Sequence, residues 1–276
     1  APPISSIGVP ECIMSKLDLL LAKIQELAEP AIGADNARVS ILDFGTSIHI
    51  DFHGSPFDEP YACLCEGLVD EAVSGKLASL RLSSPMDAGA NGTRNWDLDP
   101  LLKATNFPSL RQLKIEQNVP GNHNRVIVAS MYEEDGVLAR LIEKTPRLES
   151  LVVPSAPDIR FFATKLPSLT HLSVDAGYDT QGFVRNLAES TCFQSLRYLE
   201  FGEYNETHMD NFLDSCTSLA DYERLFESEA FRAVRHFTLR NPQLTDASVN
   251  KLRALRPSAQ FTFQVVKWSS SYIRVA

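Results

Sequence analysis

Apolar residues recur along this chain with the spacing L-x-x-L-x-L, whose last three positions alternate as they do in a β-strand. Seven segments carry the pattern, at Val39-Leu42-Phe44, Leu77-Leu80-Leu82, Leu110-Leu113-Ile115, Leu148-Leu151-Val153, Leu169-Leu172-Val174, Leu196-Leu199-Phe201 and Val234-Phe237-Leu239. Successive segments begin 21 to 38 residues apart. A unit this short cannot bury its own apolar face, so neighbouring units must stack. The pattern therefore predicts an α/β solenoid of parallel strands.

The segments between these strands show helical spacing. A stripe of Ile13, Leu17, Leu20, Ile24 and Leu27 predicts a helix that ends at Pro30 and covers the open end of the first strand. Further helices are predicted over residues 135–144, 182–190, 220–228 and 245–255, with Thr245 or Asp246 as the N-cap of the last, and a final strand over residues 260–264.

The first predicted strand, residues 38–44, is expected to form a hairpin through Gly45 with the alternating segment Ile48-x-Ile50-x-Phe52. Because a solenoid has no internal boundary, we expect a single domain. It consists of a leader and capping helix over residues 1–37 and a solenoid with a C-terminal cap over residues 38–276.

Composition narrows the class of partner. The net charge is −9 and the chain has no basic run, so neither nucleic acid nor an anionic membrane surface is expected as a partner. No segment has the run of about 18 apolar residues that a membrane span needs. The five cysteines are odd in number and lack the spacing of a disulfide framework, which favours a reducing compartment and the cytoplasm. The chain begins with Ala-Pro-Pro, which leaves room for a removed signal segment.

Four segments carry a family resemblance: FPSLRQLKI at 107–115, TPRLESLVV at 145–153, LPSLTHLSV at 166–174 and FRAVRHFTLRNPQLTD at 231–246. Together they resemble leucine-rich repeat proteins of the ribonuclease-inhibitor-like type, and among these a group of uncharacterised bacterial cytoplasmic proteins. The resemblance implies a right-handed horseshoe with parallel strands on the concave face, helices on the convex face, and a role in protein binding. The chain departs from the family at one position of the repeat, three residues after the last strand leucine, where the family usually has asparagine or cysteine. Only one repeat has asparagine there, at Asn118.

If the strands stack in register, the residues between the signature leucines form columns on the concave face. The first column is predicted as Ile41, Ser79, Gln112, Ser150, His171, Tyr198, His236 and Gln260. This column places the rings of His171, Tyr198 and His236 side by side. The neighbouring columns place charged side chains around these rings. The predicted partner-binding site is therefore His171, Asp175, Tyr198, Glu200, His236 and Arg240. A ligand bearing an arginine or an amide would satisfy the two carboxylates.

Three long segments follow strands, at residues 83–101, 116–136 and 202–219, and are expected to project from one edge of the solenoid. They are either binding elements or tolerated loop growth. Arg94 and Trp96 in the first are candidate loop contacts, with packing of Trp96 onto Phe107 as the alternative.

No catalytic, metal-binding or cofactor-binding motif is present, so no catalytic residue, metal or cofactor is predicted. His171, Ser173 and Asp175 do not suit a hydrolytic triad, since residues two apart on a strand lie about 6.5–7 Å apart. We expect a non-enzymatic scaffold that binds another protein, as a monomer or weak homo-oligomer. The alternatives are an adaptor or effector module of a larger or secreted system, and a hydrolase or metal-dependent enzyme that uses the His/Tyr cluster.

Overall fold

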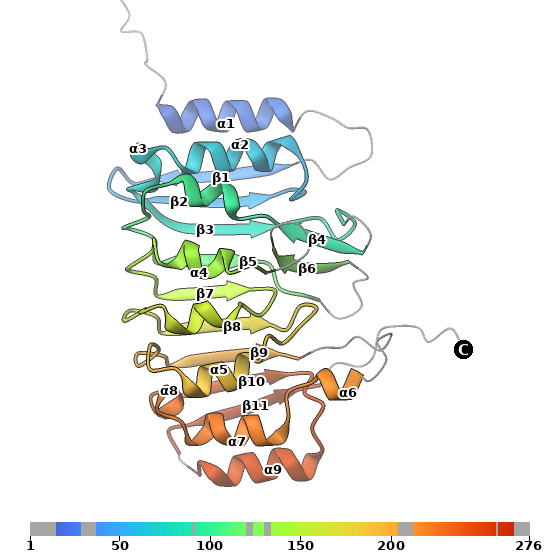
Figure 1. The fold of residues 1–276 in the computed structure, drawn as a ribbon. Coiled ribbons are helices and arrows are strands. Elements are labelled where there is room, and N and C mark those ends of the chain that lie inside the picture. The colour runs from blue at the N-terminus through green and yellow to red at the C-terminus, as the bar shows by residue number, and fades with distance from the viewer. Residues whose placement is uncertain are drawn as a thin grey trace, which may run out of the picture.

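The computed structural model describes residues 15–28, 37–89, 92–119, 124–129, 134–203, 212–257 and 259–267. The predicted leader before Ser15 and the end of the predicted C-terminal cap, residues 268–276, lie outside this part. The fold is mixed α/β, built on an open and mostly parallel sheet (Figure 1). In spatial order its strands are β1 (Arg38–Asp43), β2 (Ile48–His53), β3 (Leu77–Ser83), β5 (Gln112–Ile115), β7 (Ser150–Val153), β8 (His171–Asp175), β9 (Tyr198–Gly202), β10 (His236–Arg240) and β11 (Thr262–Val266).

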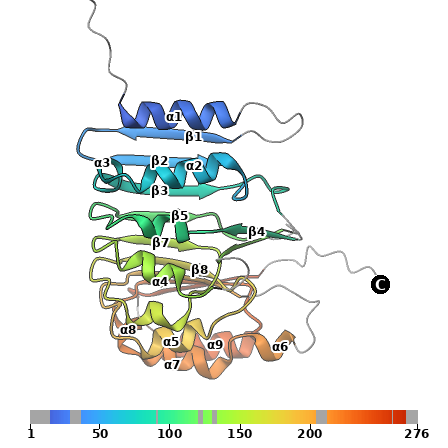
Figure 2. The same cartoon turned by 45° about the horizontal axis from the view of Figure 1, so that its top comes forward.

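Helices cover one face of this sheet, as both views show (Figures 1 and 2). The helices are α1 (Lys16–Leu27), α2 (Glu59–Leu68), α3 (Glu71–Ser74), η1 (Asp99–Lys103), α4 (Val137–Ile142), η2 (Ile159–Ala163), α5 (Phe183–Glu189), α7 (Leu219–Glu227), α8 (Glu229–Arg232) and α9 (Asp246–Leu255). The short helix α6 (Phe212–Ser215) lies beyond the ends of the strands (Figure 1). The signature residues of β3 to β10, such as Leu172 and Val174, are buried in the core beneath the covering helices. We call the opposite face of the sheet the open face.

The predicted helices are present, most with shorter bounds than expected, while α7 keeps its predicted length and begins one residue earlier. Helix α1 begins at Lys16 because the Ser15 hydroxyl accepts a hydrogen bond from the Asp18 N–H, and the Asp18 carboxylate accepts one from the Ser15 N–H. At the other end of the chain, Thr245 is the N-cap of α9, and its Oγ1 accepts the Ser248 N–H at 3.2 Å. The cap side chain therefore comes from Thr245 rather than Asp246.

The hairpin of β1 and β2 is confirmed, but the assignment of the first repeat to Val39-Leu42-Phe44 is wrong. β1 runs antiparallel to β2, and β2 is the strand that pairs in parallel with β3. Leu42 and Phe44 are exposed, whereas Ile50 and Phe52 in β2 lie in the core in line with the leucines of β3. Every second residue of β2 is buried, so one whole side of this strand faces the core. β2 is therefore the first strand of the parallel series, the place that the L-x-x-L-x-L spacing assigned to β1.

The first two long segments form a second, two-stranded parallel sheet of β4 (Thr93–Trp96) and β6 (Arg125–Val128). Arg94 is 1% exposed and Trp96 is 0% exposed, so the prediction that they are surface contacts is wrong. The Trp96 ring meets the edge of Tyr61, with 4.9 Å between centroids. The Arg94 guanidinium forms an ion pair with Glu116 at 3.3 Å. The pairing of β4 with β6 thus draws both side chains into the interior.

Candidate functional site

The open face presents side chains in columns, because neighbouring strands are in register. The first column runs His49, Ser79, Gln112, Ser150, His171, Tyr198, His236 and Thr262. The prediction is confirmed from Ser79 to His236 and wrong at both ends. Ile41 faces the core opposite Ile50, so His49 takes its place. The last strand pairs through Thr262 rather than Gln260.

Three ring side chains stack on one another near the middle of this column. The centroids of His171 and Tyr198 are 5.8 Å apart, and those of Tyr198 and His236 are 4.7 Å apart with an interplanar angle of 2°. These separations follow from the strand spacing of about 4.8 Å, which sets the distance between side chains at equivalent positions. Tyr198 keeps 47% of its surface exposed. The stack therefore presents two imidazoles and a phenol to solvent.

Arg240 joins the two carboxylates that were predicted to surround this stack. Its guanidinium forms an ion pair with Asp175 and a second one with Glu200, whose Oε1 lies 2.5 Å from Nε. Asp175 is almost fully buried and also accepts the Asn118 backbone N–H at 2.8 Å. The prediction that an external arginine or amide satisfies both carboxylates is wrong, because Arg240 already does so.

Gly202 is the residue that allows this arrangement. It stands on β9 between Asp175 of β8 and Arg240 of β10. A Cβ at this position would lie 2.4 Å from Asp175 Oδ1, closer than a Cβ approaches another heavy atom, and 3.1 Å from Arg240 Nη2, which is tighter than an ordinary contact. The ion pair between Asp175 and Arg240 can therefore cross the intervening strand only because that strand has a glycine here.

Burial changes the titration of two of these residues. It raises the pKa of Asp175 to about 6, even though Arg240 and the Asn118 N–H favour the charged carboxylate. Burial also lowers the pKa of His171, and the positive charge of Lys114 lowers it further, while Glu200 opposes both. The pKa of His171 therefore responds to Lys114 on β5 and to Glu200 on β9.

A segment that was predicted only as part of a loop shapes the rest of this face. After β5, Gln117 donates a hydrogen bond from Nε2 to Ser173 Oγ at 2.7 Å. The side chain of Asn118 donates to the Pro154 carbonyl at 2.8 Å and accepts the Val126 N–H at 2.8 Å. This asparagine holds the segment in place, and its position after the repeat strand was the one sequence signal for it.

A hollow of about 530 Å³ lies beside this segment on the open face, and we call it the open-face trough. Its lining residues are Asp51, Arg81, Leu82, Ser83, Lys114, Glu116, Gln117, Asn118, Val119, Glu200 and Arg240. Charged side chains from β2, β3, β5, β9 and β10 thus contribute to one depression. Of the predicted site, it includes Glu200 and Arg240.

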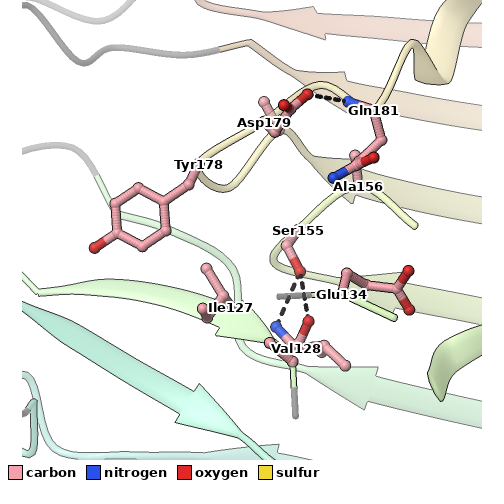
Figure 3. A pocket seen from close by; sticks show the side chains of 10 residues that line it. Ile127, Val128, Glu134, Ser155, Ala156, Tyr178, Asp179 and Gln181 are labelled. Atoms are coloured by element: carbon pink, nitrogen blue, oxygen red, sulfur yellow. Dashed lines mark hydrogen bonds between the residues drawn. The ribbon is translucent and has the colours of Figure 1, made fainter. Parts of the chain in front are cut away.

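A second hollow, of about 330 Å³, lies where strands end and is shown in Figure 3. One of its two carboxylates, Glu134, accepts hydrogen bonds from the backbone N–H groups of Gly136, Leu138 and Asp158, and the other, Asp179, accepts the Gln181 N–H. Ser155 Oγ accepts the Val128 N–H at 2.9 Å. These polar groups hold the surrounding chain in place, so the open face is the better candidate site.

The polar side chains of the predicted site are engaged with neighbouring residues or stacked on one another. His171 and Ser173 lie on the same face of β8 two residues apart, and the Ser173 hydroxyl is engaged by Gln117. His171 and His236 lie on either side of the Tyr198 ring, which separates the two imidazoles. Within the described ranges, no three His, Cys, Asp or Glu side chains are grouped to hold a metal ion. What the arrangement offers is a contact surface of aromatic and charged groups.

Comparisons with known proteins give no family. No family model matches the chain, and no curated protein matches it. Among solved structures, the chain is similar to the crystal structure of a protein from Bacteroides fragilis, with 16% identity and a TM-score of 0.44. The similarity covers 74% of this chain and 60% of that one. Separately, no described helix combines the length and the apolar character needed to cross a bilayer.

Proposed function

We propose that this protein is a leucine-rich repeat scaffold that binds another protein. Its horseshoe would be right-handed, with the open face as its concave side. The observation that carries the proposal is the asymmetry of the sheet, in which one face is buried under helices while the other presents polar and aromatic side chains in register. No described helix covers this face, so the side chains that remain exposed on it, such as Tyr198, are available to a partner.

The composition of the open face supports a protein partner. Tyrosine and arginine are the residues most often found as anchors of protein interfaces. Tyr198 stands exposed in the stacked row, and the ion pairs of Arg240 fix the charged groups beside it. The row therefore combines a rigid aromatic group with a preorganised charged border, which limits the entropy lost on binding.

The proposed setting is the cytoplasm. Cys63, Cys65, Cys192 and Cys216 are free thiols in the described part of the chain. Free cysteines of this number are typical of proteins kept in a reducing compartment. This setting agrees with a scaffold that meets its partner inside the cell.

Site-specific photo-crosslinking in cells of the source tests the proposal. A photoreactive phenylalanine analogue replaces Tyr198 in one variant and Leu255 in the other, because Leu255 is 39% exposed but lies on helix α9. We expect a discrete cross-linked protein from position 198 and none from position 255. Equal yields at both positions, or a cross-link from position 255 alone, would contradict a partner site on the open face.

A further inference from the structure

Two cations lie side by side on the open face. Arg81 of β3 and Lys114 of β5 are directly opposed in the parallel register. Like charges at opposed positions of a sheet repel each other. Asp51 offsets one of them through its contact with Arg81 at 3.5 Å. On its other side, Lys114 faces Val152, which carries no charge.

Lys114 consequently differs from the other charged side chains that line the open-face trough. Within the described ranges it forms no ion pair, whereas Arg81 pairs with Asp51, and Arg240 pairs with both Asp175 and Glu200. The side chain is exposed and lines the open-face trough. Its positive charge also reaches as far as His171, whose pKa it lowers. An anion placed on Lys114 would relieve its repulsion with Arg81.

The trough has room for such an anion. Its volume of about 530 Å³ falls in the range of about 300–1,000 Å³ that is usual for ligand sites. Gln117 and Asn118 provide polar groups along one wall, and Val119 provides an exposed apolar contact. The net charge of −9 repels long polyanions, so the single uncompensated lysine suits one short anionic segment rather than a nucleic acid.

We propose that the open-face trough binds an acidic peptide segment of the partner, with a Glu or Asp carboxylate placed on Lys114 beside Arg81. This inference rests on the proposed scaffold function and adds the chemistry of the partner. The acidic side chain forms a charge-assisted hydrogen bond with the Lys114 ammonium. The peptide backbone meets the side-chain amide of Gln117.

Fluorescence anisotropy with labelled hexaglutamate tests this proposal, with labelled hexaglutamine as the uncharged control. We expect hexaglutamate to bind the wild-type protein more tightly, with an affinity that falls as salt is added. The variant Lys114→Gln should lose about fivefold in affinity, the size of one exposed ion pair. The matched variant Lys165→Gln, which removes an exposed lysine away from the trough, should bind as the wild type does. Equal binding of the two peptides, or no loss in Lys114→Gln, would overturn the proposal.

An NMR titration of His171 gives an independent readout on the same samples. Neutralisation of Lys114 removes a charge that lowers the pKa of His171, so that pKa should rise both in Lys114→Gln and on saturation with hexaglutamate. An unchanged pKa with bound hexaglutamate would mean that the peptide binds elsewhere. A short single-stranded RNA that bound through Lys114 more tightly than hexaglutamate would also overturn the acidic-peptide assignment. Cross-linking at position 198 without hexaglutamate binding would leave the scaffold proposal standing and remove only the acidic partner.

Discussion

At the scale of single residues, Arg240 sets the charge balance of the open face. It lies between a buried carboxylate on β8 and a half-buried one on β9, and Gly202 leaves the space that lets it reach the first. A buried carboxylate without such a partner would be strongly destabilising. The charge of Asp175 is therefore held inside the protein, whereas Glu200 stays partly exposed on the open face with the stacked rings and Lys114.

The raised pKa of Asp175 predicts a pH dependence of stability. An unfolded aspartate titrates near 3.9, whereas burial raises the pKa of Asp175 to about 6 in the folded protein. The folded state holds this proton more tightly, so the carboxyl lowers the free energy of unfolding as pH rises from about 4 to about 6. The decrease is at most about 3 kcal/mol, since one pKa unit corresponds to about 1.4 kcal/mol.

Urea denaturation of wild type and Asp175→Asn at several pH values measures this contribution. The variant keeps an acceptor for the Asn118 N–H but cannot titrate. We expect the wild-type free energy of unfolding to fall relative to that of the variant between pH 4 and pH 6. Parallel curves across that window would show that Asp175 titrates normally.

The residues of the open-face column were predictable from the sequence because alternation along a strand fixes which side chains share a face. His171, Tyr198 and His236 follow directly from the flanking leucines. The partners of Asp175 were not predictable, since Arg240 crosses β9 to reach it and only the register reveals that distance. The burial of Arg94 was also hidden, because an arginine in a long segment is usually exposed.

At the scale of elements, β2 and not β1 provides the first buried face of the parallel sheet. Both segments contain alternating apolar residues, and the L-x-x-L-x-L spacing alone favoured β1. The antiparallel hairpin turns the chain round, so that β1 becomes the edge strand with Leu42 and Phe44 exposed. The repeat spacing therefore indicated how many strands to expect but not which of two adjacent strands begins the parallel series.

A pair of identical substitutions tests the roles of β1 and β2. Phe52 is 0% exposed, and Phe52→Ala should lower the free energy of unfolding by about 3–5 kcal/mol, as large-to-small changes in a core do. Phe44 is 66% exposed, and its ring makes a T-shaped contact with His49, so Phe44→Ala should cost less than about 1 kcal/mol. Denaturation of both variants measures the difference. A larger loss of unfolding free energy in Phe44→Ala than in Phe52→Ala would contradict this assignment and favour β1 as the first repeat strand.

At the scale of the whole molecule, the two faces of the sheet differ in burial and chemistry. Its helix-covered face carries the core, whereas the open face carries the stacked rings, the ion pairs and the trough. The mixed α/β fold and the parallel stacking followed from the period of the apolar residues. The second sheet of β4 and β6 did not, because it joins two insertions that share no repeat with the rest of the chain.

The affinity for the partner cross-linked at position 198 tests most directly whether the open face is the binding surface. Isothermal titration calorimetry compares the wild type with Tyr198→Ala and Leu255→Ala, two truncations of exposed side chains on opposite faces. We predict that Tyr198→Ala weakens binding by about thirtyfold, which corresponds to an interface anchor worth about 2 kcal/mol, and that Leu255→Ala changes it by less than about twofold. Equal affinities for all three proteins, or a larger loss in Leu255→Ala, would contradict the account.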